Sequence, residues 1–170
     1  NWSKNRGGAM RIESGVIFNN CTIKDNRAEG NGGAISYGTF TNGSQGHLDA
    51  AGVTNWFPPD GILSLDAQTV IQNNTTDSYG GAISIEASFI HFSDNSATVY
   101  LNNLGEQFKM GFELNGASIA NNSAKDGGAI HMMRDTDFYG LESNLNWGDV
   151  LDNRANNNGG FMFMTESINS

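Results

Sequence analysis

The sequence lacks several features that stabilise or anchor small domains. Its 170 residues include one cysteine, Cys21, so no disulfide can form within the chain, and only two prolines. No segment approaches the roughly 20 consecutive apolar residues of a membrane-spanning helix, so direct membrane insertion is not expected. Lysine and arginine number 9 against 18 aspartates and glutamates, and the formal charge of −9 argues against a nucleic-acid partner.

Glycine is abundant, and five glycine pairs open similar short segments. The five copies are Gly7-Gly8-Ala9-Met10, Gly32-Gly33-Ala34-Ile35, Gly80-Gly81-Ala82-Ile83, Gly127-Gly128-Ala129-Ile130 and Gly159-Gly160-Phe161-Met162. The third and fifth residues after each first glycine are apolar or aromatic, and a period of two places them on one face of a strand. Because a glycine pair suits a tight turn, each copy predicts a turn followed by a strand.

Asparagine recurs six residues before the first glycine of each pair, and a small residue follows two positions later. An apolar residue precedes this asparagine by three positions in three copies; in the copy that contains Asn121 the position is Ser118, and Ile119 lies one residue away. Side-chain amides stacked at equivalent positions can bond along the stack. The predicted structural ladder, including one degenerate copy, consists of Asn1, Asn26, Asn74, Asn95, Asn121 and Asn153.

Two degenerate copies extend the repeat. Asp60-Gly61-Ile62-Leu63-Ser64-Leu65 is similar to a strand start, and Phe92-Ser93-Asp94-Asn95 places a missing glycine position at Leu101. No segment has the 3.6-residue periodicity of a helical repeat. We therefore predict one all-β domain over 1–170, a right-handed parallel β-helix (β-solenoid) of about seven rungs and about 34 Å in length. Residues 38–59 and 135–147 are expected to leave the coil as loops.

The combination of Gly-Gly-Ala-Ile with a Phe-x-x-Asn turn resembles the repeats of chlamydial polymorphic outer-membrane proteins. Phe92-Ser93-Asp94-Asn95 is the literal match to the turn; elsewhere Ile or Val replaces Phe, and Phe161-Met162 replaces Ala-Ile after the last pair. The resemblance implies a surface-displayed β-helix with an adhesive role, and an extracellular or cell-surface location.

The two ends of the sequence complete one another's repeat. Placing Asn1-Trp2-Ser3 after Ile168-Asn169-Ser170 restores an apolar residue, two variable residues, asparagine and a small residue at the usual distance from Gly7. The coil at this junction would span 18 residues. We expect the chain itself to be a partner, stacked head to tail, because a contact that does not close on itself generates a fibre.

Six asparagines lie in Asn-x-Ser/Thr sequons and are candidate sites for covalent glycans. They are Asn42, Asn20, Asn73, Asn1, Asn74 and Asn121. Three of these, Asn1, Asn74 and Asn121, also occupy the repeated turn, so the ladder is an alternative reason for their presence.

No catalytic residue, metal ligand or cofactor site is predicted. Asp149, Asp152 and Arg154 are close in sequence, but acids beside a turn are more often solvated, and the three histidines do not recur at metal-ligand spacing. The leading hypothesis is a structural subunit or repeat of an extracellular fibre. The alternative is an adhesin fragment whose loop, through Trp56 and Phe57, binds a host surface or glycan; a carbohydrate-active enzyme ranks third.

Overall fold

The computed structural model describes residues 1–12, 16–39, 61–87, 110–135, 141–144 and 148–167, and the structural statements below concern these residues. They form strands, turns and bends, with no helix among them. It follows that none of the described segments is a helix able to cross a membrane.

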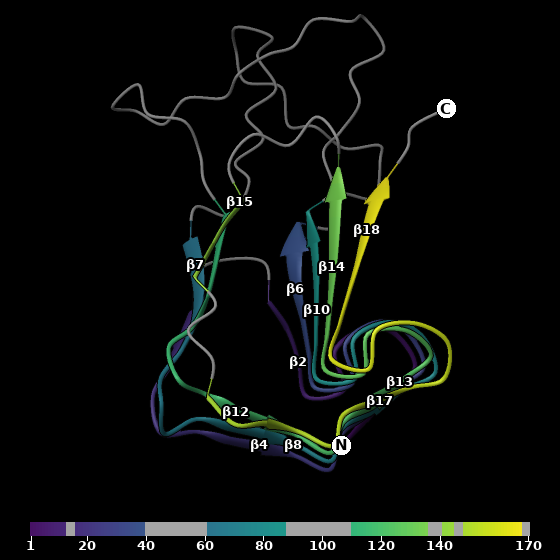
Figure 1. Ribbon diagram of the computed structural model, residues 1–170, viewed down its shortest axis with the longest axis horizontal. Coiled ribbons are helices and arrows are strands. Elements are labelled where there is room, and N and C mark those ends of the chain that lie inside the picture. The colour runs from purple at the N-terminus through teal and green to yellow at the C-terminus, as the bar shows by residue number, and fades with distance from the viewer. Residues whose placement is uncertain (13–15, 40–60, 88–109, 136–140, 145–147, 168–170) are drawn as a thin grey trace, which may run out of the picture.

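The strands form four parallel sheets, here named A to D (Figure 1). Sheet A contains β1 (Trp2–Ser3), β5 (Arg27–Ala28), β9 (Thr75–Thr76), β13 (Ser123–Ala124) and β17 (Arg154–Ala155). Sheet B contains β2 (Met10–Ile12), β6 (Ile35–Thr39), β10 (Ile83–Ala87), β14 (Ile130–Asp135) and β18 (Met162–Ser167). Sheet C contains β3 (Val16–Phe18), β7 (Gly61–Leu65), β11 (Met110–Leu114) and β15 (Leu141–Asn144). Sheet D contains β4 (Thr22–Lys24), β8 (Val70–Gln72), β12 (Ser118–Ala120) and β16 (Val150–Leu151).

The chain visits the sheets in the fixed order A, B, C, D and then returns to A one level further along the stack. Strands of one sheet therefore lie behind one another in Figure 1, each paired in register with the strand one level away. In sheet B, for example, Ile83 is paired with Ile35 on one side and with Ile130 on the other. This arrangement confirms the all-β, parallel part of the prediction and is consistent with a β-helix.

The expected count of about seven rungs is not confirmed. The described strands stack five deep in sheets A and B and four deep in sheets C and D. Gly61–Leu65 does not start a separate level, because β7 pairs with β3 and β11 in sheet C. Its alternating apolar residues identify a strand without identifying its sheet, which is why the sequence misassigned it. The position projected at Leu101 lies outside the described residues.

The two predicted loop excursions differ from the structure at their described ends. Gly38 and Thr39 belong to β6, and 40–59 lie outside the described residues. Within the second segment, β15 pairs with β11, so 141–144 contribute a strand to sheet C. The remainder of 136–147 is not described.

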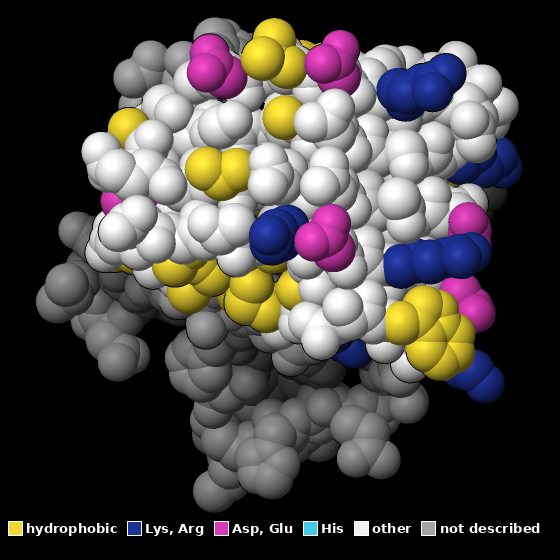
Figure 2. All heavy atoms as spheres, turned by 90° about the horizontal axis from the view of Figure 1, so that it is seen from below, with side chains coloured by type: hydrophobic (Ala, Val, Ile, Leu, Met, Phe, Trp, Pro, Cys, Tyr) yellow, Lys and Arg dark blue, Asp and Glu magenta, His cyan; other side chains and the backbone are white. Residues whose placement is uncertain are grey.

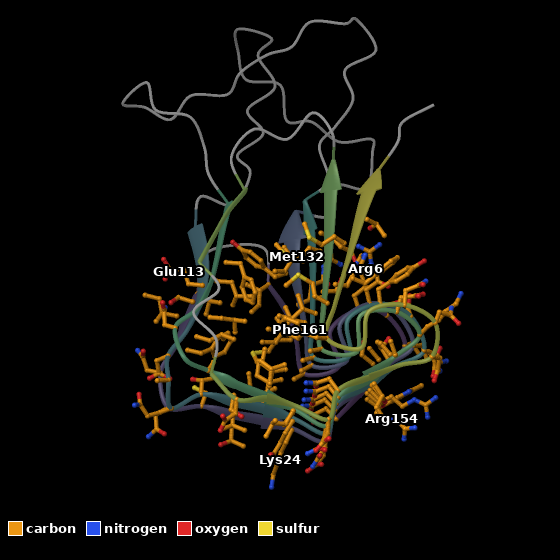
Figure 3. All side chains as sticks on the ribbon, viewed as in Figure 1. Arg6, Lys24, Glu113, Met132, Arg154 and Phe161 are labelled. Carbon is orange, nitrogen blue, oxygen red and sulfur yellow. The ribbon has the colours of Figure 1, made fainter. Side chains whose placement is uncertain are left out.

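Apolar side chains of sheets B, C and D that face the interior form one core. In sheet B, Ile35, Ile83 and Ile130 occupy the same register position and are fully buried. Leu63 and Phe112 in sheet C and Ile71 and Ile119 in sheet D pack in the same buried cluster. Met132 points into this enclosed space in Figure 3, whereas Lys24, Glu113 and Arg154 point away from it. On the strands of these three sheets, period-two alternation therefore separates the residues that face this core from those that face away from it.

Each level turns through two corners with left-handed backbone. The corner from sheet D to sheet A uses Asx residues with φ between 53° and 56°: Asp25, Asn73, Asn121 and Asp152. The turn from sheet A to sheet B, here called the A–B turn, uses the first glycine of each pair, with φ between 62° and 76°. Glycine, asparagine and aspartate are the residues that tolerate this conformation best, which explains their recurrence at fixed positions.

Candidate functional site

An asparagine ladder runs along the stack beside the corner between sheets D and A. The Oδ1 atom of Asn74 accepts two hydrogen bonds from Asn26, one from its backbone N–H at 3.0 Å and one from its Nδ2 at 2.9 Å. The Oδ1 of Asn122 accepts the same pair from Asn74, both at 2.9 Å. Every donor therefore belongs to one level and its acceptor to the next. The members are Asn1, Asn26, Asn74, Asn122 and Asn153.

The ladder predicted from the sequence is correct at four positions and wrong at Asn121. Ile119 pairs with Ile71, which places Asn122 above Asn74 and leaves Asn121 as the exposed left-handed corner residue. The A–B turn of this level is one residue shorter than in the other copies, so counting back from Gly127 shifts the register by one. Asn95 lies outside the described residues.

A second ladder is made by the second glycine of each pair. A Cβ atom built on Gly8, Gly33 or Gly81 would lie 2.1 Å from the carbonyl oxygen of the second glycine one level further along, and on Gly128 it would lie 2.2 Å away. Atoms cannot approach so closely, so only glycine fits while the levels stay stacked. The sequence indicated a turn at these pairs, but this stacking contact is the stronger constraint on the second residue.

The outer face of sheet B carries a polar cluster centred on three buried residues, Ser84, Glu86 and His131. Together with the partly exposed Arg6, Asn31, Tyr79 and Thr165 they are here called the outer cluster. The A–B turns fold back beside this face (Figure 1), and Figure 3 shows Arg6 on the side of sheet B away from the core. Glu86 is only 2% exposed and forms an ion pair with Arg6. Asn31 and Ser84 also donate to Glu86, the latter at 3.2 Å.

His131 forms the other half of the outer cluster. Its Nδ1 lies 3.2 Å from Ser84 Oγ and its Nε2 lies 3.0 Å from Thr165 Oγ1. The ring of Tyr79, from an A–B turn, stacks on the imidazole with 4.7 Å between centroids, and the ring of Phe163 lies 6.0 Å from the imidazole and 6.4 Å from Tyr79. Burial lowers the pKa of His131 to about 4, with Asp126 opposing the shift. The imidazole is therefore neutral at pH 7.

Serine, histidine and glutamate are the residue types of a hydrolase triad, but their arrangement here differs from one. Glu86 accepts from Ser84 and Arg6, whereas in a triad the carboxylate orients the histidine. Ser84 is fully buried, and His131 is 2% exposed. Within the described part of the chain, no group of three or more His, Cys, Asp or Glu side chains is placed to hold a metal ion. The geometry suits a clamp between turn and sheet.

The sequon asparagines occupy different environments. Asn74 is fully buried in the ladder, so its amide is not accessible to modification in the folded chain. Asn20, Asn73 and Asn121 are exposed at left-handed corners. Asn1 is exposed and donates to Asn26. Three further predicted positions lie in segments outside the described residues: Asn42, Trp56 and Phe57.

The predicted junction residues are described at one end only. Trp2 and Ser3 form β1, which pairs with β5 as the other sheet A strands pair with one another. Trp2 is 57% exposed, and Lys4 Nζ lies 6.0 Å from its ring centroid. The other predicted members, Ile168, Asn169 and Ser170, lie outside the described residues.

The outer faces of sheets A and D carry few charges, and Figure 2 shows scattered hydrophobic and charged side chains among backbone and uncharged polar groups. Arg27 and Asp77 form an ion pair of 2.9 Å there, with side chains 56% and 63% exposed. Because solvent screens exposed pairs, we expect Arg27→Ala to cause almost no loss of stability in urea denaturation. A larger loss that persists in high salt would contradict this assignment.

Comparison with known proteins supports the repeat. The family model described as the Chlamydia polymorphic membrane protein repeat matches residues 20–37 and 68–86. Each match begins just before a sheet D strand, passes through a ladder asparagine and a glycine pair, and ends in sheet B. No curated protein and no solved structure matches the chain. The chain thus carries repeats of the Chlamydia polymorphic membrane protein type, as its sequence predicted.

Proposed function

We propose that this chain is a right-handed parallel β-helix that forms the rigid exposed part of a surface protein of the polymorphic membrane protein type. The observation that carries the proposal is the register shared by successive levels, in which asparagine and glycine each continue a ladder through all five. The right-handed sense is the one that parallel crossovers adopt. The matched repeats come from a family of membrane proteins, which supports an outer-membrane or cell-surface location.

The role that fits this architecture is structural, a scaffold that can be extended by adding levels. At the glycine pairs of the A–B turns, backbone N–H groups donate to the next level, as from Gly8 to Gly32 and from Gly33 to Gly80, and earlier in the same turns they donate to the preceding level, as from Gly30 to Asn5. A further coil of the same repeat would continue this pattern, either within one chain or as a second copy stacked head to tail. Such continuation would make the protein part of an extracellular fibre.

Adhesion remains the alternative function. Four connections of very different length, 13–15, 40–60, 88–109 and 136–140, all join a strand of sheet B to a strand of sheet C. Two of them are long enough to carry a binding surface, and 40–60 include Trp56 and Phe57. The described strands that flank these connections therefore all lie at the same corner of the stack, between sheets B and C.

The first experiment is electron microscopy of the purified chain, together with protease treatment of intact cells that produce it. The proposed fibre predicts thin filaments with an axial repeat near 24 Å, from five levels of roughly 4.8 Å. Cleavage of the chain on intact cells would support a surface location, and complete protection would contradict it. Discrete rods at all concentrations would contradict the fibre.

A matched variant tests the adhesin alternative. Residues 40–60 are replaced by Glu13-Ser14-Gly15, the chain's own short connection between the same two sheets. Binding of the chain to host cells or a glycan array that is lost in this variant, while its thermal stability is retained, would favour adhesion. Equal binding by both proteins would exclude this segment as the binding site.

A further inference from the structure

The A–B turns are fastened to the outer face of sheet B mainly through two side chains. Arg6 and Asn31, from the A–B turns of the first two levels, both contact Glu86 on β10. Tyr79, from the third A–B turn, stacks on His131 of β14. Contacts from three successive turns therefore converge on one carboxylate and one imidazole.

Ser84 connects these two side chains into one unit. Its Oγ lies 3.2 Å from both Glu86 Oε1 and His131 Nδ1, and a hydroxyl has one proton to donate. If Ser84 donates to the carboxylate, Nδ1–H donates to Ser84 Oγ, and Nε2 accepts from the Thr165 hydroxyl. This scheme satisfies each partner with a neutral imidazole and an ionised Glu86.

The surroundings of His131 disfavour a protonated imidazole. Among the described residues, the ionisable groups around the cluster are Glu86 from β10, Asp126 and Tyr79 from the A–B turns, Arg6 from the first A–B turn, and Arg11, which lies in the same register row on β2. Asp126 is 4% exposed, and its Oδ1 already accepts two bonds from Asn158. Protonation of His131 would add a charge to a side chain that is only 2% exposed.

We propose that the outer cluster is an acid-sensitive clasp, which holds the A–B turns against sheet B at neutral pH and releases them on acidification. Release exposes the outer face of sheet B, including Ser36 and Ser84, while the core between sheets B, C and D stays closed. This inference rests on the described contacts and is independent of the proposed surface function.

The direction of the pH dependence follows from His131. Its pKa is lowered to about 4 by burial, against an ordinary value of 6.5 when the ring is exposed. The open form therefore binds protons more readily between these values, so the clasp is fully favoured above about pH 6.5 and weakens as the pH falls toward 4. The difference corresponds to a shift of the opening equilibrium of up to roughly 300-fold.

Hydrogen exchange of the folded chain at pH 7.0 and 4.5, corrected for the intrinsic rate, tests the clasp. We expect amides of the A–B turns, such as those of Gly32 and Gly80, to lose at least 10-fold more protection at pH 4.5 than amides of sheets C and D. His131→Phe retains an aromatic ring beside Tyr79 but cannot be protonated. In this variant, the loss of amide protection in the A–B turns between pH 7.0 and 4.5 should be at least 5-fold smaller than in the unmodified chain.

A second His131 variant and a control outside the outer cluster complete the test. His131→Gln provides an uncharged hydrogen-bonding side chain if the phenylalanine variant does not fold, and Asp77→Asn removes an exposed carboxylate outside the clasp. The former should reduce the pH response, and the latter should leave it as in the unmodified chain. Equal protection of the turns at both pH values, or an unchanged response in both His131 variants, would overturn the proposal.

Discussion

Asn74→Ala is expected to lower the free energy of unfolding by about 3–5 kcal/mol. The side chain is fully buried and donates to Ile23 O, Gln72 O and Asn122 Oδ1 at 2.9 to 3.1 Å. It also accepts two bonds from Asn26. Alanine would leave several buried donors and acceptors on two neighbouring levels unpaired, each at a cost of about 1–3 kcal/mol that water entering the gap offsets in part.

Asn73→Gly is the matched control for this substitution. Asn73 is adjacent in sequence, but it is exposed, and its backbone φ of 56° is one that glycine adopts readily. The control should change the free energy of unfolding by less than about 1 kcal/mol. Urea denaturation followed by circular dichroism measures both, and similar losses in the two variants would refute a special role for the ladder.

Gly81→Ala is expected to have a larger effect, of more than about 4 kcal/mol, or to prevent folding. The new Cβ would lie 2.1 Å from Gly128 O and 2.7 Å from Ser123 N, and both are backbone atoms of the next level. Neither atom can move aside by a change of rotamer. The levels would have to separate, which would break the sheet and ladder bonds between them.

Gly160→Ala places the same methyl group at the equivalent position of the fifth level. There the atom nearest to the added Cβ would be Asn153 O at 3.4 Å, which is an ordinary contact. The backbone is not left-handed at Gly81 or at Gly160, so alanine fits the backbone conformation at both positions. We expect this variant to unfold within a few degrees of the unmodified chain in a thermal scan. A melting temperature equally depressed in both variants would show that glycine is needed for the turn itself and not for stacking.

The sequence predicted the repeating strand and the asparagine ladder, because their spacing is local, but it assigned the glycine pairs to turns and did not predict that their second residues stack. It misplaced the fourth ladder residue, since Asn121 and Asn122 are adjacent and only the pairing of Ile119 with Ile71 distinguishes them. It also assigned Gly61–Leu65 to a new level, because alternation is the same in sheet C as in sheet B. Register between levels is a property of pairing, which spacing alone does not determine.

The outer cluster could not be predicted from the sequence. Ser84, Glu86 and His131 occupy the positions of their strands that alternate with the core, where solvent exposure is the ordinary expectation. They are buried because the A–B turns fold over this face, and that depends on contacts between levels up to 80 residues apart in sequence. Because these residues are polar, the sequence alone did not indicate that the A–B turns cover the outer face of sheet B.

The connections that differ most in length all join sheet B to sheet C, so this corner can accept changes that the rest of the repeat cannot. Connections of 3 and 21 residues join sheets B and C at successive levels, yet β2 and β6 remain paired in register, as do β3 and β7. The length and sequence of the connection at this corner can therefore vary without changing the register between levels. Insertions of different length can therefore be placed at this corner, and engineers can graft peptides there, without changing the pairing of the strands on either side.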